Sequence, residues 1–261
     1  MKRMSRLFGA FVLASIAGAA AAAEVRVMIS AGFYGVYEQM APAFERTTGH
    51  KLVTSRGPTV GDSPEAIPNR LARGESADVV IGDGRGAEDL AKRGFIRQET
   101  WIDFAKSKVG MVVREGAPRP DISTVEALKA TLLAAKSVAY SDSTSGTYLS
   151  TTLFPKLGIA DQLAPKSRKV RGPPSGEPVA AVVARGEAEI GFQQMSELMH
   201  VSGVVVVGPI PEELQPGSSF GGAVTTNSKQ PQAGAELLKF LSSKEAEAVI
   251  TKAGLTPIAT R

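Results

Sequence analysis

A polar run from Ser141 to Tyr148 carries the side chains best suited to bind a ligand. It reads Ser-Asp-Ser-Thr-Ser-Gly-Thr-Tyr, with a β-like run before it and a helical pattern after it. Hydroxyl groups and free backbone N–H groups at the start of a helix bind anions, because these donors and the positive end of the helix dipole point the same way. The run therefore predicts a small-anion site. The residues expected to contact the anion are Ser141, Thr144, Ser145, Gly146, Thr147 and Tyr148.

Two features of this run leave another interpretation open. Ser145 or Thr144 could act only as the N-cap of the helix, a role that explains one or two hydroxyls but not the whole cluster. Asp142 opposes an anion unless its carboxylate points away from the site.

Other candidates follow the remaining predicted strands. In open α/β sheets, ligands lie beyond the carboxyl ends of the strands, so the loops that leave those ends are where a site is expected. The candidates in these loops are Ser30, Gly32, Phe33, Arg56, Ser63, Arg171, Gln193 and Gln194. The guanidinium of Arg56 is suited to bind a carboxylate through two parallel hydrogen bonds, although a solvated loop arginine is an equal alternative. The case for Arg171 is weaker, because the strand before it is weakly marked.

The signatures of familiar enzymes are missing. The chain has no cysteine and two histidines, and neither Ser-x-x-Lys nor Gly-x-Ser-x-Gly occurs. The segment Gly82–Gly86 lacks the six-residue dinucleotide fingerprint. We therefore predict a protein that is not an enzyme and that has no catalytic residue, no metal and no cofactor. An exported enzyme stays as an alternative.

The first 23 residues are predicted to be a cleaved signal peptide, which places the protein in the periplasm. Lys2, Arg3 and Arg6 form a basic start, the rest of the stretch is uncharged, and it ends in three alanines. A membrane anchor is the alternative, and the dilution by Ala and Gly argues against it. Without the three basic residues the formal net charge falls from +4 by three, to +1. Since the remaining Lys and Arg are scattered, no nucleic-acid partner is expected.

The elements that must position these residues alternate between strand and helix. This alternation, with 43% hydrophobic and 21% charged residues, indicates a globular α/β fold. Capping boxes are predicted at Ser123-x-x-Glu126 and Ser242-x-x-Glu245. Strands are predicted at 25–30, 51–55, 78–82, 109–114, 137–141, 189–192 and 203–208, and helices at 36–47, 125–135, 147–157, 179–185 and 233–241.

One pattern occurs twice. Ala72-Arg-Gly-Glu75 leads into Asp78–Gly82, and Ala184-Arg-Gly-Glu187 leads into Glu189–Phe192. Two equivalent α/β lobes would produce this repeat, although helix–glycine–strand units are common enough to recur by chance.

The ordered motifs resemble those of the bacterial molybdate-binding protein family, within the type II periplasmic solute-binding proteins. The segments that carry the resemblance are Val27–Gly32, Thr48–Lys51, Leu71–Val80, Leu90–Ile96, Ser145–Tyr148, Gly186–Gly191, Ile210–Leu214 and Phe240–Ala246. The resemblance implies two α/β lobes, each a mostly parallel sheet flanked by helices. It implies lobe I at 24–107 plus 219–261 and lobe II at 108–218, after the signal peptide at 1–23. It also implies a monomer that binds a small anion by hinge closure and docks on an inner-membrane ABC permease with an ATPase.

The family's ligand donors transfer only in part. Ser145-Gly-Thr-Tyr148 matches the third loop of the family, and Ser63 stands for the serine of the second. The serine of the first loop falls on Gly32, and the late tyrosine falls at about Gln194. The resemblance therefore implies an ABC-type solute-binding component for a molybdate-like oxyanion or a small organic acid. A di- or tricarboxylate binder for uptake or sensing is the alternative.

Overall fold

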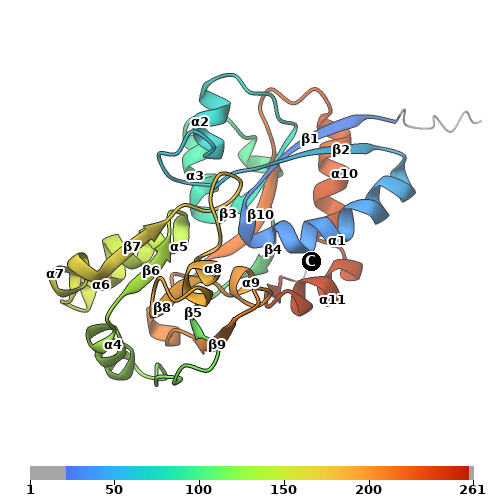
Figure 1. Cartoon of the computed structure of the whole chain (residues 1–261). Helices are drawn as coiled ribbons and strands as arrows, with labels where there is room; N and C mark the ends of the chain where they lie inside the picture. The colour runs from blue at the N-terminus through green and yellow to red at the C-terminus, as the bar shows by residue number, and fades with distance from the viewer. Residues whose placement is uncertain (1–21, 259–261) are drawn as a thin grey trace, which may run out of the picture.

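The computed structural model describes residues 22–258, so nearly all of the predicted signal peptide lies outside the described residues. The described chain forms two lobes, each built on one sheet, as Figure 1 shows. The sheet of lobe I has six strands in the order β11-β4-β10-β3-β1-β2. Their bounds are β1 Glu24–Ile29, β2 Lys51–Arg56, β3 Val79–Asp83, β4 Ile102–Lys106, β10 Ser219–Val224 and β11 Thr256–Pro257.

The sheet of lobe II has five strands in the order β7-β6-β8-β5-β9. Their bounds are β5 Val109–Arg114, β6 Val138–Ser141, β7 Ser167–Val170, β8 Ile190–Gln194 and β9 Val204–Pro209. Both sheets are mixed, because β10 runs antiparallel to β3 and β5 runs antiparallel to β8. The predicted two-lobed α/β class is confirmed.

The two sheets repeat the same arrangement. In lobe I, β1 pairs in parallel with β2 and β3, and in lobe II, β6 pairs in parallel with β7 and β8. The two copies of the sequence repeat lead into β3 and β8, which hold equivalent positions. The ends of β3 and β8 are therefore matched points of the two lobes.

Helices cover both faces of each sheet. In lobe I, alternate residues of a strand face opposite sides of the sheet. Val27 and Ile29 pack beneath α1 (Ala31–Thr48) and α10 (Pro231–Leu241), and Met28 packs beneath α2 (Ile67–Ala72) and α3 (Gly84–Lys92). Within residues 22–258, no helix is both long enough and apolar enough to span a bilayer. The helices are α1 Ala31–Thr48, α2 Ile67–Ala72, α3 Gly84–Lys92, α4 Val125–Ala134, α5 Thr144–Tyr148, α6 Phe154–Lys156, α7 Ala160–Leu163, α8 Val179–Ala184, α9 Met195–Leu198, α10 Pro231–Leu241 and α11 Lys244–Lys252.

Several local predictions differ from the structure. The N-cap of α4 is Thr124 and not Ser123, because the Thr124 hydroxyl accepts from Ala127 N at 3.1 Å. The last helix likewise starts after Ser243 rather than Ser242. The predicted helix 147–157 is divided by a π-helical turn at Leu149–Leu153. Strands β4, β10 and β11 were missed, and β7, the weakly marked strand before Arg171, is confirmed at Ser167–Val170.

The chain crosses between the lobes twice, and the two crossings touch. The first crossing is the short link Ser107–Lys108 between β4 and β5, and the second lies between β9 and β10. Ser107 N donates to Ser218 O at 2.9 Å, which joins the two crossings. Placing the lobe boundaries at 107/108 and 218/219 remains our proposal.

Asp78, just before β3, is hydrogen-bonded both to β1 and to the segment before α10, and so connects three parts of lobe I. Its Oδ1 accepts from Ser228 Oγ and from the backbone N–H groups of Lys229 and Gln230, at 2.8 to 3.0 Å. Its Oδ2 accepts from Arg26 N in β1 at 2.9 Å. Burial alone would raise the pKa of Asp78, but these hydrogen bonds outweigh it and lower the pKa. Asp78 also replaces the missing side-chain cap of α10.

We predict that Asp78→Ala lowers the free energy of unfolding by about 3 kcal/mol, since it leaves several backbone donors without a partner. A carboxyl whose pKa is lower in the folded than in the unfolded state stabilises the fold above its unfolded pKa, and this stabilisation is lost as the pH falls through the folded pKa. Urea unfolding should therefore show that the free energy of unfolding falls more between pH 7 and pH 3 for wild type than for Asp78→Asn. An equal fall in the two proteins would contradict the lowered pKa of Asp78.

Candidate functional site

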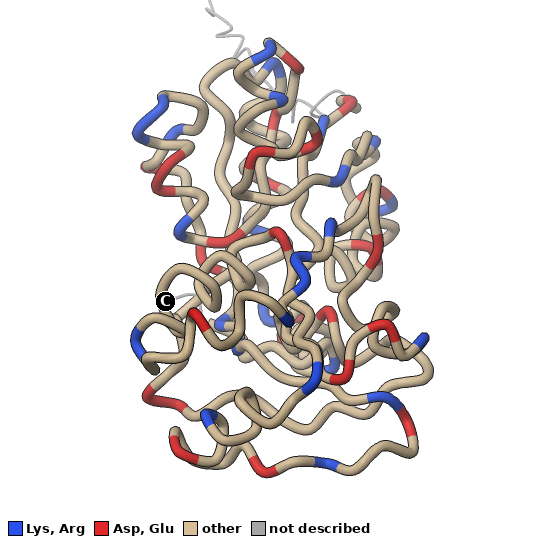
Figure 2. Tube along the Cα trace, turned by 60° about the vertical axis from the view of Figure 1, so that its left-hand side comes forward, with Lys and Arg blue, Asp and Glu red and all other residues tan. Residues whose placement is uncertain are grey.

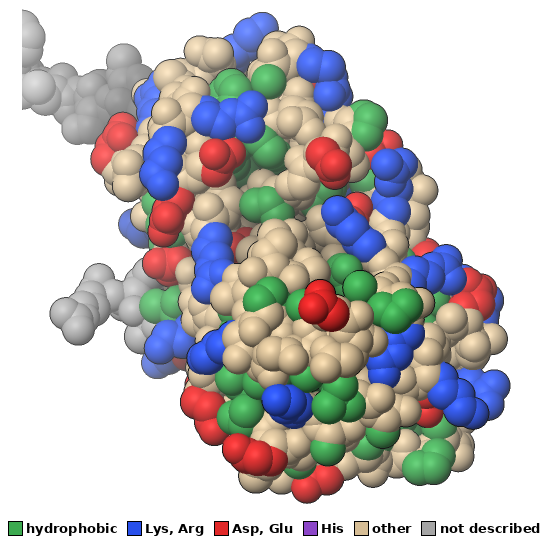
Figure 3. Space-filling view, turned by 90° about the vertical axis from the view of Figure 1, so that its left-hand side faces the viewer, with side chains coloured by type: hydrophobic (Ala, Val, Ile, Leu, Met, Phe, Trp, Pro, Cys, Tyr) green, Lys and Arg blue, Asp and Glu red, His purple; other side chains and the backbone are tan. Residues whose placement is uncertain are grey.

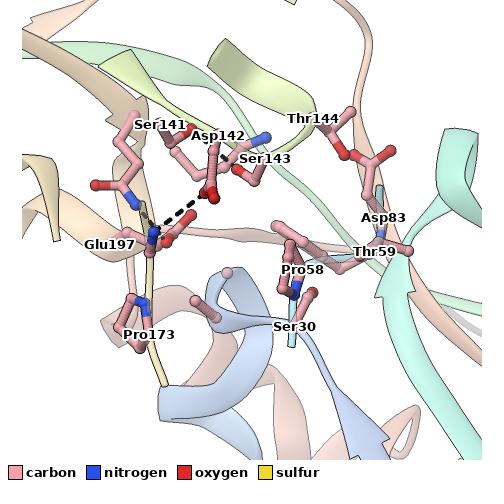
Figure 4. A pocket seen from close by; sticks show the side chains of 16 residues that line it. Ser30, Pro58, Thr59, Asp83, Ser141, Asp142, Ser143, Thr144, Pro173 and Glu197 are labelled. Atoms are coloured by element: carbon pink, nitrogen blue, oxygen red, sulfur yellow. Dashed lines mark hydrogen bonds between the residues drawn. The ribbon is translucent and has the colours of Figure 1, made fainter. Parts of the chain in front are cut away.

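A cavity lies between the two lobes, beyond the ends of their central strands. Its unfilled space, counted out to the mouth, is about 470 Å³. Figure 4 shows side chains from both lobes facing it. Lobe I lines it with Ser30, Ala31, Gly32, Pro58, Thr59, Asp83 and Phe220, and lobe II with Ser141, Asp142, Ser143, Thr144, Gly172, Pro173, Gln193, Gln194 and Glu197.

Ser30 brings a free hydroxyl to the cavity at the start of the 18-residue helix α1. Its backbone N–H donates to Ile81 O at 3.0 Å, which fixes the turn after β1. The hydroxyl is buried, does not cap the helix, and has no hydrogen-bond partner among the described residues. A free hydroxyl beside the N–H groups of the first helical turn is a donor set suited to a carboxylate or oxyanion.

Thr59 and Asp83 form the opposite side of the lobe I wall. The side chain of Thr59 fills the space above Gly82 and Gly86, where an added Cβ would lie 2.6 and 2.3 Å from its atoms. Thr59 Oγ1 accepts from Asp83 N at 3.3 Å. The glycines of Gly82-Asp-Gly-Arg-Gly86 thus make room for Thr59 and bring Asp83 to the cavity.

The polar run of lobe II supplies a chain of hydroxyls. Ser141 Oγ lies 2.9 Å from Ser143 Oγ and 3.0 Å from Ser145 Oγ. Asp142 also lines the cavity, and its Oδ1 accepts from Gly172 N at 3.1 Å (Figure 4). An anion site made only of neutral donors would require the Asp142 carboxylate to point away from the cavity. Because Asp142 lines the cavity, this requirement is not met.

Gln193, Gln194 and Glu197 come from the end of β8 and from α9. Gln193 Oε1 accepts from Val179 N at 3.0 Å, and its Nε2 donates to Glu197 Oε2 at 2.6 Å. Gln194 Oε1 accepts from Ser107 Oγ at 2.6 Å. The hinge crossing is thereby hydrogen-bonded directly to a residue of the cavity wall.

The charge of the cavity is unlike that of a simple anion site. Three carboxyl groups line it, those of Asp83, Asp142 and Glu197, and no lysine or arginine does. Figures 2 and 3 show acidic and basic residues interspersed over both lobes, with no continuous basic area on the face in view. The cavity therefore gives an anionic ligand no direct ion pair.

Burial changes how two of these carboxyl groups titrate. Desolvation raises the pKa of Glu197 to about 7, against the opposing effects of the Gln193 hydrogen bond and the positive charge of Arg56. Desolvation also raises the pKa of Asp83, against the opposing hydrogen bond from Arg85 N. A carboxyl group with a pKa near neutrality, such as that of Glu197, gives and takes protons readily, which is what acid–base catalysis requires.

Six of the predicted residues line the cavity, and their contact with a ligand stays a prediction. They come from both lobes, as expected for loops at strand ends. They are Ser30, Gly32, Ser141, Thr144, Gln193 and Gln194.

Four predicted residues of the polar run lie behind the wall. Ser145 is buried against Ser141, and Thr147 is exposed on α5. Tyr148 does not offer its hydroxyl to the cavity, because it donates to Leu214 O at 2.7 Å. Gly146, within α5, allows the helix to lie close to the end of β6, since an added Cβ would lie 1.7 Å from Ser141 O.

The other four predicted residues also lie outside the cavity lining. Phe33 packs in the core of lobe I, with its ring centroid 5.0 Å from that of Phe104. The guanidinium of Arg56 lies 4.1 Å from the centroid of the Tyr34 ring. Ser63 is buried and its carbonyl oxygen accepts from an asparagine side chain, while Arg171 is exposed.

Four residues of the cavity wall were not predicted from the sequence: Glu197, Asp83, Thr59 and Phe220. Glu197 stands in a four-residue helix and belongs to no motif. Asp83 lies in the glycine-rich segment Gly82–Gly86, which was noted only because it lacks the dinucleotide-binding fingerprint. Its position directly after a buried strand was the one signal that could have marked it.

Contacts across the cavity hold the lobes close together. Ser196 Oγ of lobe II donates to Gly32 O of lobe I at 2.7 Å. The guanidinium of Arg85 on α3 lies 5.5 Å from the centroid of the Tyr148 ring on α5. Both lobes therefore enclose the cavity in this structure. Among residues 22–258, no group of three His, Cys, Asp or Glu side chains is placed to hold a metal ion.

Residues 25–256 match the family described as bacterial extracellular solute-binding protein. The chain belongs to this family. A molybdate-binding protein of Azotobacter vinelandii is 28% identical over 255 residues, which cover 96% of this chain and 97% of that protein. The solved periplasmic molybdate-binding protein of the same organism superimposes with a TM-score of 0.69 at 20% identity, covering 91% of this chain and 100% of that one. The expected distant relation to molybdate-binding proteins is confirmed.

A second relative corrects the prediction that the protein is not an enzyme. A protein of Pseudomonas sp named aconitate isomerase is 44% identical over 252 residues, which cover 96% of this chain and 95% of that protein. A relative this similar over nearly the whole chain carries the name of an enzyme, so the non-enzyme prediction is wrong. It rested on missing motifs, and the absence of a known motif does not exclude an enzyme.

We predict that Gly146→Ala destabilises lobe II, since the new methyl group would meet the backbone of Ser141, which cannot move aside. The expected loss is about 3 kcal/mol or more, measured by urea unfolding. Gly35→Ala in helix α1 is the matched control, because nothing lies within 4 Å of its added Cβ. That variant should be unchanged or more stable by up to about 1 kcal/mol. Equal effects of the two substitutions would contradict the role given to Gly146.

Proposed function

We propose that this protein is an isomerase acting on a small unsaturated tricarboxylate, with aconitate as the substrate to test. The observation that carries the proposal is Glu197, a half-buried carboxyl in the cavity between the lobes whose pKa is raised to about 7. The relative named aconitate isomerase, similar over nearly the whole chain, supports the choice of substrate.

The chemistry of aconitate suits a proton shift. The molecule is a three-carbon alkene with a carboxylate on each carbon, and one carbon is a methylene next to the double bond. Removing a methylene proton leaves an electron pair delocalised over the three carbons and the carboxylates. Returning a proton to the opposite end carbon moves the double bond and allows the other geometry to form. No atom is gained or lost, so the protein needs only to remove, hold and return protons.

The residues of the cavity provide the means to bind such a substrate. The free hydroxyl of Ser30 and the first N–H groups of α1 face one part of it, and the serines and threonine of lobe II face another. When Asp83 and Glu197 are protonated, they become neutral hydrogen-bond donors to substrate carboxylates instead of repelling them. A trianion is therefore expected to bind together with one or more protons.

Uptake through an ABC permease and ATPase is the second candidate, supported by the family match and by the molybdate-binding relative. The signal peptide, the periplasmic location and a monomeric state belong to this proposal and to the first alike. Molybdate fits the cavity poorly, because three carboxyl groups face it and no basic side chain does. An exported isomerase on a solute-binding scaffold accounts for both relatives.

We predict that Glu197→Gln lowers kcat for aconitate isomerisation by about 100-fold or more, since the amide keeps the shape but cannot carry a proton. Proton NMR follows the reaction, because the two isomers give separate vinyl signals. Glu247→Gln, an exposed glutamate on α11, is the control and should retain full activity. Near-normal turnover by Glu197→Gln would remove Glu197 from the mechanism, and absence of turnover by wild type would reject the isomerase function itself.

We also predict that anion binding weakens as the pH rises. Below pH 7 Glu197 is mostly protonated and donates a hydrogen bond, and above pH 7 it is charged and repels the ligand. The dissociation constant of propane-1,2,3-tricarboxylate, a saturated analogue, should rise roughly tenfold or more between pH 6.5 and 8.5. Calorimetric titration measures it, and Glu197→Gln should largely lose this dependence. An equal change of the dissociation constant with pH in wild type and Glu197→Gln would contradict the prediction.

A further inference from the structure

Asp83 has a carboxylate oxygen that the fold does not use. It is the N-cap of α3, where its Oδ1 accepts from Arg85 N at 2.9 Å. Its Oδ2 is buried and has no hydrogen-bond partner among the described residues. Ser218 and Gly86 lie close enough to favour the charged form, but neither makes a hydrogen bond to Oδ2. An N-cap needs one oxygen, and Asn or Ser would provide it without a buried charge.

Keeping a carboxyl at this position is costly for the fold alone. The side chain of Asp83 is 2% exposed, and a buried carboxylate oxygen without a donor loses its hydration with no replacement. Burial raises the pKa of Asp83, so the group moves toward the neutral acid that can give up a proton. Asp83 lines the cavity, and an oxygen that the fold leaves without a partner there points to a role in the reaction.

Asp83 and Glu197 reach the cavity from opposite lobes. Asp83 ends β3 of lobe I, and Glu197 follows the end of β8, the matched strand of lobe II. Lobe I contributes no other titratable side chain to the cavity lining. A substrate between the lobes would thus have one proton carrier on each side.

We propose that Asp83 is the second proton carrier of the isomerisation, and that Asp83 and Glu197 each serve one end of the substrate's three-carbon unit. This inference rests on the proposed isomerase function. In one direction, the carboxylate of one residue takes the methylene proton while the C–H electron pair enters the conjugated system. The carboxylic acid of the other residue then gives its proton to the opposite end carbon, forming a new C–H bond.

The reverse reaction exchanges the two roles. After one turnover the first carboxyl is protonated and the second is not, which is the starting state for the reverse reaction. Repeated turnover in one direction requires the pair to return to its first state by proton exchange with water at the cavity. No oxidant, reductant or cofactor enters the balance.

Deuterium exchange separates this mechanism from one that uses Glu197 alone. Asp83→Asn and Glu197→Gln are incubated with each aconitate isomer in D2O, and NMR follows both isomerisation and loss of the substrate C–H signals. With two carriers, isomerisation falls about 100-fold or more in both variants. Exchange should then be reciprocal: Asp83→Asn still exchanges one isomer, and Glu197→Gln exchanges only the other.

Asp83→Asn should fold normally, because asparagine caps a helix as well as aspartate does. An unchanged unfolding midpoint verifies this, and Asp89→Asn, exposed on the same helix, is the control expected to keep full activity. Isomerisation by Asp83→Asn within tenfold of wild type, or loss of exchange with both isomers, would overturn the role of Asp83. A wild-type protein that does not isomerise aconitate would instead reject the proposed function.

Discussion

The structure brings three carboxyl groups together in one cavity and places no basic side chain in its lining. Burial of a carboxyl group without a paired cation disfavours its ionisation, and the pKa values of Asp83 and Glu197 are raised for this reason. This single constraint changes the character of the site. A cleft that would repel anions when ionised becomes, when partly protonated, a site that donates hydrogen bonds and protons to them.

The symmetry of the two lobes explains how the cavity acquires this character. Each lobe ends its central strand, β3 or β8, at the cavity, and each starts a helix there. The hydrogen bond of Ser107 to Gln194 links the hinge to one of these strand ends. Arg56 stays outside the lining, yet its charge limits how far the pKa of Glu197 rises. The contact between the two lobes therefore brings the three carboxyl groups into one cavity.

The fold could be predicted from the sequence because short-range patterns of residues indicate its strands and helices. Alternating strands and helices, glycine-terminated helices and the repeat at residues 72–82 and 184–192 all point to two α/β lobes. Ser30, Ser141 and Gln193 were predicted from their positions at strand ends, and all three line the cavity. It failed for Tyr148, whose hydroxyl is taken by a backbone carbonyl, a partner 66 residues away in sequence.

The acidic residues of the site could not be found in the same way. The raised pKa of Glu197 arises from burial between two lobes, and no local spacing records that burial. Asp83 has an evident local role as an N-cap, so the sequence gives no sign that its second oxygen has no partner. The absence of enzyme motifs was therefore misleading, because proton transfer between carboxyl groups depends on desolvation rather than on a signature.

A relationship between solute binding and isomerisation follows from the same geometry. A solute-binding cleft already selects a small anion, excludes water and closes around the ligand. In the proposed isomerase, the carboxyl groups at the strand ends add proton exchange to this binding.

The central claim, that the cavity keeps a carboxyl group titrating near neutrality, can be measured directly. The side-chain carboxyl carbon of Glu197 is followed by ¹³C NMR as a function of pH in ¹³C-glutamate-labelled protein, with Glu197→Gln used to assign the signal. The account predicts a titration midpoint of about 7. A midpoint near 4.5, the ordinary value for glutamate, would contradict it.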